Sequence, residues 1–390
     1  MGQLRVYFSV FGSGLGHITR ILELSNRLAG ADVKYSTSGQ GLAFLEAKSL
    51  RDKAAPTPHL DVEWGPVGGF SSYSVLPRFP IMFNTFLRQL ASERRSMAMF
   101  RPSVVVSDSK LSPVFAGRSL SYPVVTMLNQ FKVLFPPRFR RGRTGRLFER
   151  IAADNLGLMW SLSDRVLVTD LPPPLTIGEA NVYGSGITNI VEFVGFTTPR
   201  SEATPETMAR TKEALGLGER PLVYCPISGP EATKGTLQKA LLRACEAITR
   251  KYDLVISMGR SGGSTEPERL SRGGWLYQWC PVKDELFGLA DAVVSRAGHS
   301  TIGQCIEHGK PAVLLPIHNH PEQIANSEKF RELGLGVDIR AERLTPEGLI
   351  GGIDSLLGDG RYRRRVESVQ RVSARYRGIE RCAEIIRGYS

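Results

Sequence analysis

Two segments near the start of the chain carry residues that could do acid–base chemistry. Phe11–His17 (FGSGLGH) is a glycine-rich turn that ends in His17, where a helical pattern begins, and Val104–Asp108 (VVVSD) is an apolar run that ends in a carboxylate. A histidine so placed can act as a general base, and an aspartate beside it can orient the imidazole and stabilise its cation. Both residues would equally suit helix capping.

The turn holds three glycines, Gly12, Gly14 and Gly16, in the spacing GxGxG, whereas dinucleotide-binding proteins use GxGxxG. The next predicted strand ends in Ser36–Thr37–Ser38 and lacks the acidic residue that would bind a ribose. NAD is therefore not the expected ligand. The glycines would instead let a large group approach the backbone closely, which predicts a substrate loop.

A denser group of polar side chains lies between Val293 and Asn326. The apolar strand Asp291–Ser295 leads into a turn and a helix predicted over Thr301–His308, which Gly309 would end in the left-handed conformation. Free N–H groups at the start of such a helix attract phosphate. A second strand, Pro311–Leu315, leads into a polar loop at the same edge of the sheet, where ligands bind. An ordinary crossover with polar loops is the alternative to a ligand site whose candidates are Arg296, Gly298, His299, Ser300, Thr301, His318, His320, Glu322, Gln323 and Asn326.

Another candidate for phosphate binding is the turn Pro226–Glu231, which also follows an apolar strand. Ser228 and Gly229 could donate hydrogen bonds to a diphosphate, and Arg260, which follows the next strand, could reach the same group. The turn lacks a full Walker pattern, so an NTPase is not predicted. Farther on, Trp279 would suit either contact with a base ring or packing in the core.

Two segments combine apolar and basic side chains. Tyr73–Leu90 is apolar and aromatic with two arginines, and Arg138–Arg150 holds six arginines and one glutamate. With a net charge of +12, this pattern favours contact with an anionic membrane surface. The alternative is a loop that packs on its own domain and exposes a basic face. No recognisable nucleic-acid-binding module accompanies the arginines, so nucleic acid is not an expected partner.

Composition narrows the class of protein further. The chain is 42% hydrophobic and 23% charged, as in globular proteins, and no apolar run reaches the length of a membrane span. Its five cysteines are scattered without a CxxC pair, so neither a metal site nor a disulfide framework is expected. Because a strand pattern begins at Leu4, we expect no signal peptide, and the expected location is the cytoplasm, at the inner face of the cell membrane.

Alternating strands and helices must position these residues. The first half has predicted strands at Leu4–Val10, Ala31–Thr37, Val104–Asp108, Pro123–Leu128 and Arg165–Thr169. The second half repeats the scheme at Pro221–Pro226, Asp253–Met258, Gly274–Tyr277, Asp291–Ser295 and Ala312–Leu315. This alternation predicts two α/β domains with doubly wound parallel sheets.

The composition changes near 195–205, where Pro, Thr and Glu cluster. We therefore expect an N-terminal domain over 1–198 and a C-terminal domain over 199–390. The last residues, 360–390, read as helical and arginine-rich and could pack back on the N-terminal domain.

Together these motifs resemble those of GT-B glycosyltransferases over essentially the whole chain. The resemblance is greatest to the group that contains the bacterial lipid-linked N-acetylglucosaminyltransferase of peptidoglycan synthesis and related archaeal proteins. Residues 293–326 are its specific part, and the glycine-rich turn lies where that group has an acceptor-side GxGGH loop. The resemblance implies two Rossmann-like domains that face a central cleft. It also implies a nucleotide-sugar donor, usually UDP-linked, held by the C-terminal domain, an acceptor over the N-terminal domain that is often a membrane lipid, no metal or cofactor, and transfer with inversion.

By position, the resemblance makes His17 the candidate base and Asp108 its acidic partner. The residues that resemble the family's donor-binding elements are Ser228 and Gly229 in the diphosphate turn, Arg296, Gly298, Ser300 and Thr301 in the phosphate segment, and Glu322, Gln323 and Asn326 in the element that holds sugar hydroxyls.

One position departs from the family. A glutamate normally binds the ribose diol three residues after Thr301, but this chain has Gln304 there. Glutamine loses the charge-assisted pair of hydrogen bonds, although Glu307, one turn later, could substitute. The identity of the donor's nucleotide is therefore not fixed by this pattern. A nucleotide-sugar 2-epimerase of the same fold would need additional carboxylates and no lipid surface, and a non-catalytic nucleotide-sugar-binding subunit would lack the base, whereas His17 is present.

Overall fold

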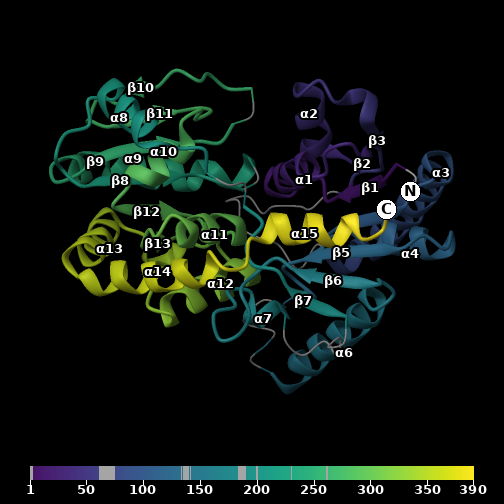
Figure 1. Cartoon of the computed structure of the whole chain (residues 1–390). Helices are drawn as coiled ribbons and strands as arrows, with labels where there is room; N and C mark the ends of the chain where they lie inside the picture. The colour runs from purple at the N-terminus through teal and green to yellow at the C-terminus, as the bar shows by residue number, and fades with distance from the viewer. Residues whose placement is uncertain are drawn as a thin grey trace. The chain divides into compact units, whose positions relative to one another are not determined.

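The computed structural model describes residues 3–60, 75–132, 134, 140, 142–182, 190–198, 201–229, 231–260 and 262–390. Its chain forms two compact units, labelled by element in Figure 1. One unit holds the described residues up to 198 together with Tyr376–Ser390, and the other holds those from 201 to 375. The C-terminal segment thus groups with the first unit, the arrangement that the sequence analysis allowed for the last residues.

The first unit is built on a parallel sheet in the order β3-β2-β1-β4-β5-β6-β7. Its central strands β4 and β5 are buried along their whole length, as expected when helices cover both faces. The five strands predicted for this half are confirmed, whereas the short β3 and β7 were not among the predicted strands. The bounds are β1 Arg5–Val10, β2 Asp32–Thr37, β3 Ala54–Pro56, β4 Val104–Asp108, β5 Val124–Leu128, β6 Arg165–Val168 and β7 Val191–Phe193.

The helices of this unit are α1 Gly16–Asn26, α2 Gly39–Ala47, α3 Val75–Phe100, α4 Ser112–Ser119, α6 Arg143–Trp160, α7 Glu179–Val182 and α15 Gly378–Arg387, with a 3-10 turn at Arg51–Lys53. The apolar segment Tyr73–Leu90 lies partly outside the described residues, and its described part belongs to the long helix α3, which the sequence did not predict as one helix.

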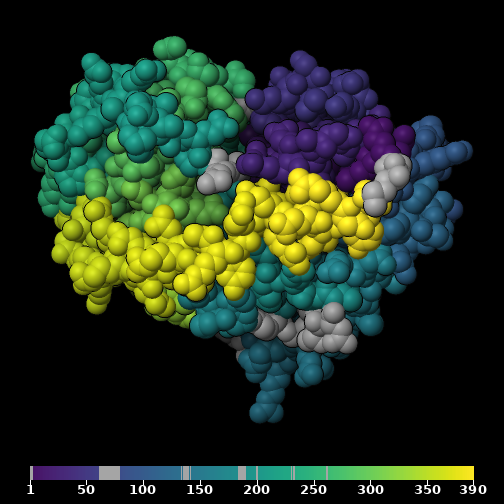
Figure 2. Space-filling view, viewed as in Figure 1, coloured from purple at the N-terminus to yellow at the C-terminus, as the bar shows by residue number. Residues whose placement is uncertain are grey.

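Helix α15 packs against α1, and Figure 2 shows the C-terminal segment at the surface beside the N-terminal segment. Two glycines permit the chain to enter this helix. A Cβ atom at Gly378 would lie 2.3 Å from the carbonyl oxygen of Phe196, and Gly195 has φ +88° and packs against Tyr376. The helix buries Cys382 and Ile386 fully.

A buried ionic network ties α3 to the sheet. The Glu93 carboxylate accepts hydrogen bonds from the hydroxyls of Tyr7 and Ser9, both at 2.7 Å, and from Ser36 at 2.8 Å. Lys110 Nζ donates to the same carboxylate at 2.8 Å. Because Glu93 is fully buried, these donors replace the water that an ionised carboxylate requires.

The second unit repeats the architecture in the order β10-β11-β9-β8-β12-β13-β14, in which β10 alone among the described pairings is antiparallel to its neighbour. The five strands predicted for this half are again confirmed. The bounds are β8 Leu222–Pro226, β9 Asp253–Ser257, β10 Glu268–Arg269, β11 Trp275–Tyr277, β12 Ala292–Ser295, β13 Ala312–Leu314 and β14 Gly336–Asp338. The prediction of two doubly wound α/β domains is confirmed.

Its helices are α8 Pro205–Ala214, α9 Glu231–Thr249, α10 Lys283–Leu289, α11 His299–Glu307, α12 Pro321–Glu332, α13 Pro346–Gly358 and α14 Gly360–Ser373, with a 3-10 turn at Ala341–Arg343. Helix α11 begins at His299, earlier than predicted. It ends as predicted, because Gly309 has φ +64° and the N–H of Lys310 donates to the carbonyl of Cys305 at 2.8 Å, which is a Schellman cap.

Candidate active site

In the first unit the strand order reverses between β1 and β4, which lie side by side. Open parallel sheets bind ligands at such a switch point, beyond the carboxyl ends of the strands. His17 lies in the first turn of α1, which follows β1, and Asp108 is the last residue of β4. Val10 and Asp108 are paired in register. The topology thus brings the two predicted residues to one place.

His17 and Asp108 are hydrogen-bonded. His17 Nδ1 lies 2.9 Å from Asp108 Oδ1, and the aspartate is fully buried while the imidazole is 25% exposed. The ring of Phe11 stands edge-on to the imidazole, with 5.7 Å between ring centroids. A proton on Nδ1 would donate to the carboxylate, so Nε2 would carry the lone pair and point away from Asp108.

Arg20, which the sequence analysis did not single out, completes this group. Its Nε donates to Asp108 Oδ2 at 2.7 Å, its Nη2 donates to Oδ1, and Nη2 lies 3.1 Å from His17 Nδ1. A third nitrogen, Nη1, donates to Thr169 Oγ1 at 3.3 Å. The spacing of Arg20 from His17 could have identified it, because residues three apart on a helix share a face.

These contacts set the charge of the group. Burial alone would raise the pKa of Asp108, but the guanidinium of Arg20 and the imidazole of His17 outweigh burial and hold that pKa well below its usual value. The carboxylate is therefore ionised at neutral pH and can offset the charge that His17 gains when it takes a proton. Burial raises the pKa of the nearby Cys382 thiol to about 12, so this thiol stays neutral.

The glycine turn differs from its expected role in part. A Cβ atom at Gly12 would lie 2.3 Å from the carbonyl oxygen of Ser38, so this glycine makes room for the chain's own loop. Gly14 has φ +78° with open space around it, and its N–H donates to Gln40 Oε1 at 2.8 Å. Gly16 is exposed at the first position of α1.

In the second unit the switch point lies between β8 and β12. Ser228, which follows β8, has its hydroxyl 3.2 Å from that of Thr301 in the first turn of α11. Gly298 is the N-cap of α11, with nothing within 4 Å of an added Cβ atom. Next to it His299 is buried and Ser300 is exposed. Hydroxyls and helix N–H groups gathered at one edge suit an anion.

Three other predicted donor-binding residues support the loops. Arg296 is buried and donates to the carbonyls of Leu315 and Thr233, at 3.1 and 3.0 Å, and burial lowers its pKa to about 10. Asn326 is fully buried and donates to the Ala297 carbonyl at 3.3 Å. The backbone N–H of Ile317 donates to Gln323 Oε1 at 3.0 Å. Part of each side chain therefore holds backbone groups of the loops, whereas Arg296 Nε and Asn326 Oδ1 are buried without a hydrogen-bond partner in the part of the chain that the structure describes.

Arg260 is partly exposed and lies in an ion-pair cluster. Its Nε donates to Glu231 Oε1 at 2.7 Å and its Nη1 to Gln278 Oε1 at 2.9 Å. Lys234 Nζ lies 3.1 Å from Glu231 Oε2. The sequence analysis anticipated the arginine but not its carboxylate partner, which stands at the start of α9.

The remaining candidates have varied surroundings. His318 Nδ1 lies 2.6 Å from Glu342 Oε1. His320 is the N-cap of α12 and accepts from the Gln323 N–H at 3.4 Å, and burial lowers its pKa. Three candidates are half-buried, namely Gln304 on α11, Glu322 in the first turn of α12 and Trp279 after β11.

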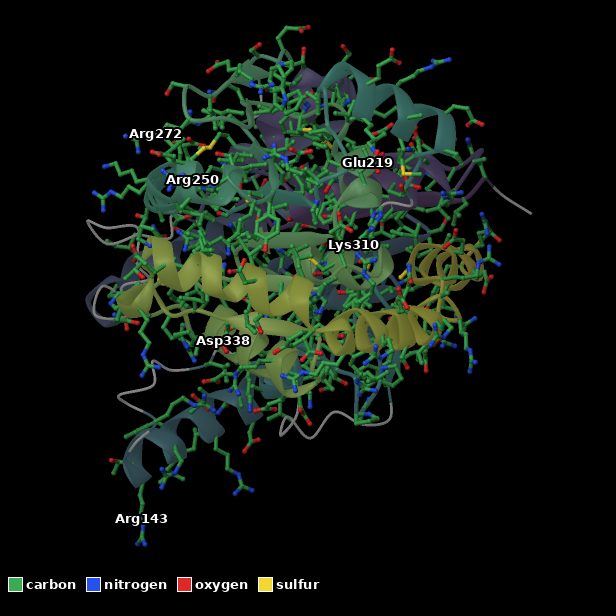
Figure 3. The ribbon with its side chains drawn as sticks, turned by 90° about the vertical axis from the view of Figure 1, so that its left-hand side faces the viewer. Arg143, Glu219, Arg250, Arg272, Lys310 and Asp338 are labelled. Atoms are coloured by element: carbon green, nitrogen blue, oxygen red, sulfur yellow. The ribbon has the colours of Figure 1, made fainter. Side chains whose placement is uncertain are left out.

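The basic segment Arg138–Arg150 lies partly outside the described residues, and from Arg143 onward it belongs to α6, which has two apolar faces. Ala153, Gly157 and Trp160 are buried on one face. The other face is exposed and consists of Leu147, Phe148, Ile151, Leu158 and Met159, which we call the apolar face of α6. Figure 3 labels Arg143 at the outer end of the helix. Among the described residues, no helix is long and apolar enough to cross a bilayer, and no three His, Cys, Asp or Glu side chains form a metal-binding group.

Comparison with known proteins agrees with the sequence resemblance. Residues 234–381 match the glycosyltransferase family 28 C-terminal domain. An uncharacterized glycosyltransferase of Methanosarcina mazei is 25% identical over 98% of both chains. A UDP-N-acetylglucosamine–N-acetylmuramyl-(pentapeptide) pyrophosphoryl-undecaprenol N-acetylglucosamine transferase of Thermotoga neapolitana is 25% identical over 58% of this chain and 65% of that protein.

Solved structures share the fold over the whole chain. The glycosyltransferase of kitacinnamycin superposes with a TM-score of 0.69 at 17% identity and covers 100% of both chains. A Streptomyces glycosyltransferase complexed with thymidine diphosphate gives a TM-score of 0.63 at 16% identity and 99% coverage of both chains. The chain is therefore a glycosyltransferase of GT-B fold, similar to the bacterial lipid-linked N-acetylglucosaminyltransferase and its archaeal relatives.

Proposed function

We propose that this glycosyltransferase moves a sugar from a UDP-sugar to a hydroxyl group of a membrane lipid or lipid-linked glycan, with inversion and without a metal ion. The observation that carries the proposal is the group formed by His17, Asp108 and Arg20 at the switch point of the first sheet. The relative from Thermotoga neapolitana supports the choice of UDP through its named donor.

In the proposed reaction, His17 Nε2 removes the proton from the acceptor hydroxyl as its oxygen attacks the anomeric carbon. The attack comes from the face opposite the bond to the diphosphate, so one displacement inverts the configuration. The bond from carbon to the diphosphate oxygen breaks with its electron pair, and the nucleoside diphosphate leaves. Asp108 stays ionised and stabilises the imidazolium formed on His17.

The donor half-site supports departure of that anion. Backbone N–H groups at the start of α11 and the hydroxyls of Ser228 and Thr301 lie at one sheet edge. Donors that are already in place stabilise charge as it develops, with little reorganisation. These donors would stabilise the negative charge of the departing diphosphate, as a metal ion does in other transferases.

A lipid acceptor is supported by the apolar face of α6. Leu147, Ile151 and Leu158 are spaced to form one stripe along the helix, and Phe148 extends it. Arg143, Arg146 and Arg150 are exposed on the same helix. Apolar side chains flanked by arginines suit the boundary between acyl chains and anionic headgroups.

The first test is calorimetric titration with UDP, GDP, dTDP and ADP in the presence of EDTA. Selective UDP binding is expected, and failure of all four nucleotides to bind contradicts the proposal. Transfer from UDP-sugars to lipid extracts is then compared between the native chain and His17→Gln. The variant should lose at least about 100-fold in kcat and keep its Kd for UDP. Full activity of His17→Gln would remove the base from the mechanism.

A further inference from the structure

The donor half-site contains a carboxylate that no step of the proposed reaction uses. Glu231, the first residue of α9, bridges two cations, with 2.7 Å between its Oε1 and Arg260 Nε and 3.1 Å between its Oε2 and Lys234 Nζ. Helix α9 follows β8 and Arg260 follows β9, so the group lies at the carboxyl edge of the sheet, beside the switch point. The Glu231 carboxylate thus pairs with two cations at the place where an anionic ligand is expected to bind.

The two cations are held by other parts of the chain. Lys234 is almost fully buried, and its Nζ also donates to the Gly259 carbonyl at 2.8 Å. Arg260 is fixed to Gln278 twice, through Nη1 to Oε1 and through its backbone N–H to the carbonyl, both at 2.9 Å. Removing the carboxylate would therefore leave the cations in place.

Of the three charged groups, the Glu231 carboxylate is the one that can move away from its partners. The Glu231 side chain is 52% exposed, whereas that of Lys234 is 6% exposed. Water competes for a carboxylate with this much exposure, which weakens its ion pairs. Burial would raise the pKa of Glu231, but the hydrogen bonds from Arg260 and Lys234 lower it overall, so the side chain is an anion at neutral pH.

We propose that Glu231 is a built-in competitor of the donor's diphosphate, which displaces the carboxylate and takes over Arg260 and Lys234. The inference rests on the proposed function, because it concerns the same donor site. It makes Glu231 a determinant of specificity. A ligand without the negative charge of a diphosphate gains little from displacing the carboxylate, whereas a nucleoside diphosphate gains both cations.

The test is calorimetric titration of the full chain with UDP and with uridine. Glu231→Gln keeps the shape of the side chain and removes its charge. We expect it to bind UDP about three- to tenfold more tightly than the native chain, since removing an exposed opposing charge is worth up to about one decade in Kd. Uridine affinity should not change. The matched control is Glu246→Gln, on the same helix, with a side chain 51% exposed and paired with Arg250 at 2.6 Å.

The outcomes separate the two proposals. Equal UDP affinity of the native chain and Glu231→Gln overturns the inference and leaves the proposed function standing. Weaker UDP binding by Glu231→Gln also overturns it, because the carboxylate would then contact the ligand directly. If neither protein binds UDP, GDP, dTDP or ADP, the donor site itself is refuted and the inference with it. If Glu246→Gln also binds UDP more tightly, the gain comes from the change in the protein's net charge, which would contradict a specific role for Glu231.

Discussion

At the scale of single residues, the unusual feature is a buried ion pair beside a partly exposed histidine. Arg20 and Asp108 are almost completely buried, so each charge is stabilised by the other in place of water. Removing one partner of such a pair generally costs about 3–5 kcal/mol. We therefore expect Arg20→Met to destabilise the first unit by about that amount, whereas Arg20→Lys, which keeps the charge and loses the two-pronged contact, should cost less.

Differential scanning calorimetry would measure this cost, with Arg118→Met as the control. Arg118 lies in the same unit and pairs with Asp164 at 3.2 Å, but both side chains are substantially exposed, so less than about 1 kcal/mol is expected. A role in positioning His17 also requires that Arg20→Lys alter the pH profile of kcat while the Kd for UDP stays the same. An unchanged pH profile would leave Arg20 a structural residue only.

The sequence could predict which residues meet, but not how each side chain is used. His17 follows β1 and Asp108 ends β4, the two strands between which the strand order reverses, so their meeting follows from the predicted fold. Arg296 and Asn326 match a ligand-binding pattern, yet Nη1 and Nη2 of the arginine and Nδ2 of the asparagine donate to backbone carbonyls. Such a choice depends on side-chain direction, which residue spacing does not encode. The contact of Glu231 with Arg260 likewise needed three-dimensional coordinates.

At the scale of elements, α3 is fastened to its sheet by the buried carboxylate of Glu93. Burial would raise the pKa of Glu93, but Lys110 and the hydroxyls of Ser9 and Tyr7 outweigh burial and lower it below the ordinary value of 4.5. A carboxyl group whose pKa is depressed by folding contributes stability that is fully present above its unfolded pKa and is lost as pH falls through the folded pKa. The network should therefore weaken in acid, below about pH 4.5.

Glu93→Gln should expose this dependence. At pH 7 the variant should melt well below the native chain, because Lys110 would lose its buried partner. As pH falls below 4.5, the two melting temperatures should converge, since the native carboxylate becomes protonated. Glu46→Gln, which alters an exposed pair with Arg51, should leave melting unchanged at every pH. A gap between native chain and Glu93→Gln that stays constant with pH would contradict the assignment.

The apolar face of α6 carries the prediction on membrane contact. Phe148→Ser removes an exposed aromatic side chain. Because the variant loses most of the apolar area that this ring would bury in the membrane, it should bind vesicles about tenfold more weakly. Sedimentation with phosphatidylglycerol vesicles measures this, and added salt should weaken binding further because it screens the arginines. The control is Met99→Ser, which removes an even more exposed apolar side chain from the end of α3. Equal loss in both variants would mean that α6 has no special part.

The elements themselves were the most predictable feature, because apolar runs such as those of β4 and β5 are unambiguous. Boundaries were less so. Helix α11 starts at His299 rather than at the predicted Thr301, since Gly298 takes the N-cap position. The short strands β3, β10 and β14 have too few residues for an apolar pattern, whereas β7 lies in the apolar run Ile190–Val194, which was not used as a signal.

At the scale of the whole molecule, the groups proposed for catalysis and for donor binding belong to different units. His17, Asp108 and Arg20 lie in the first, and Ser228 and Thr301 lie in the second. A change confined to the first unit should therefore affect transfer and leave nucleotide binding intact. The C-terminal helix α15 permits such a test, because the chain returns through it to the unit in which it began, and it packs against α1, the helix that carries His17.

Ile386 on α15 is fully buried, whereas its neighbour Ile385 is only partly buried. Replacing a buried isoleucine by alanine generally costs about 2–5 kcal/mol, so Ile386→Ala should loosen α15 against α1. We expect a lower melting temperature for the first unit, reduced transfer, and an unchanged Kd for UDP in calorimetry. Ile385→Ala should change each of these less. Loss of UDP affinity in Ile386→Ala would show that the donor half-site depends on the first unit, and the separation of roles between the units would then have to be given up.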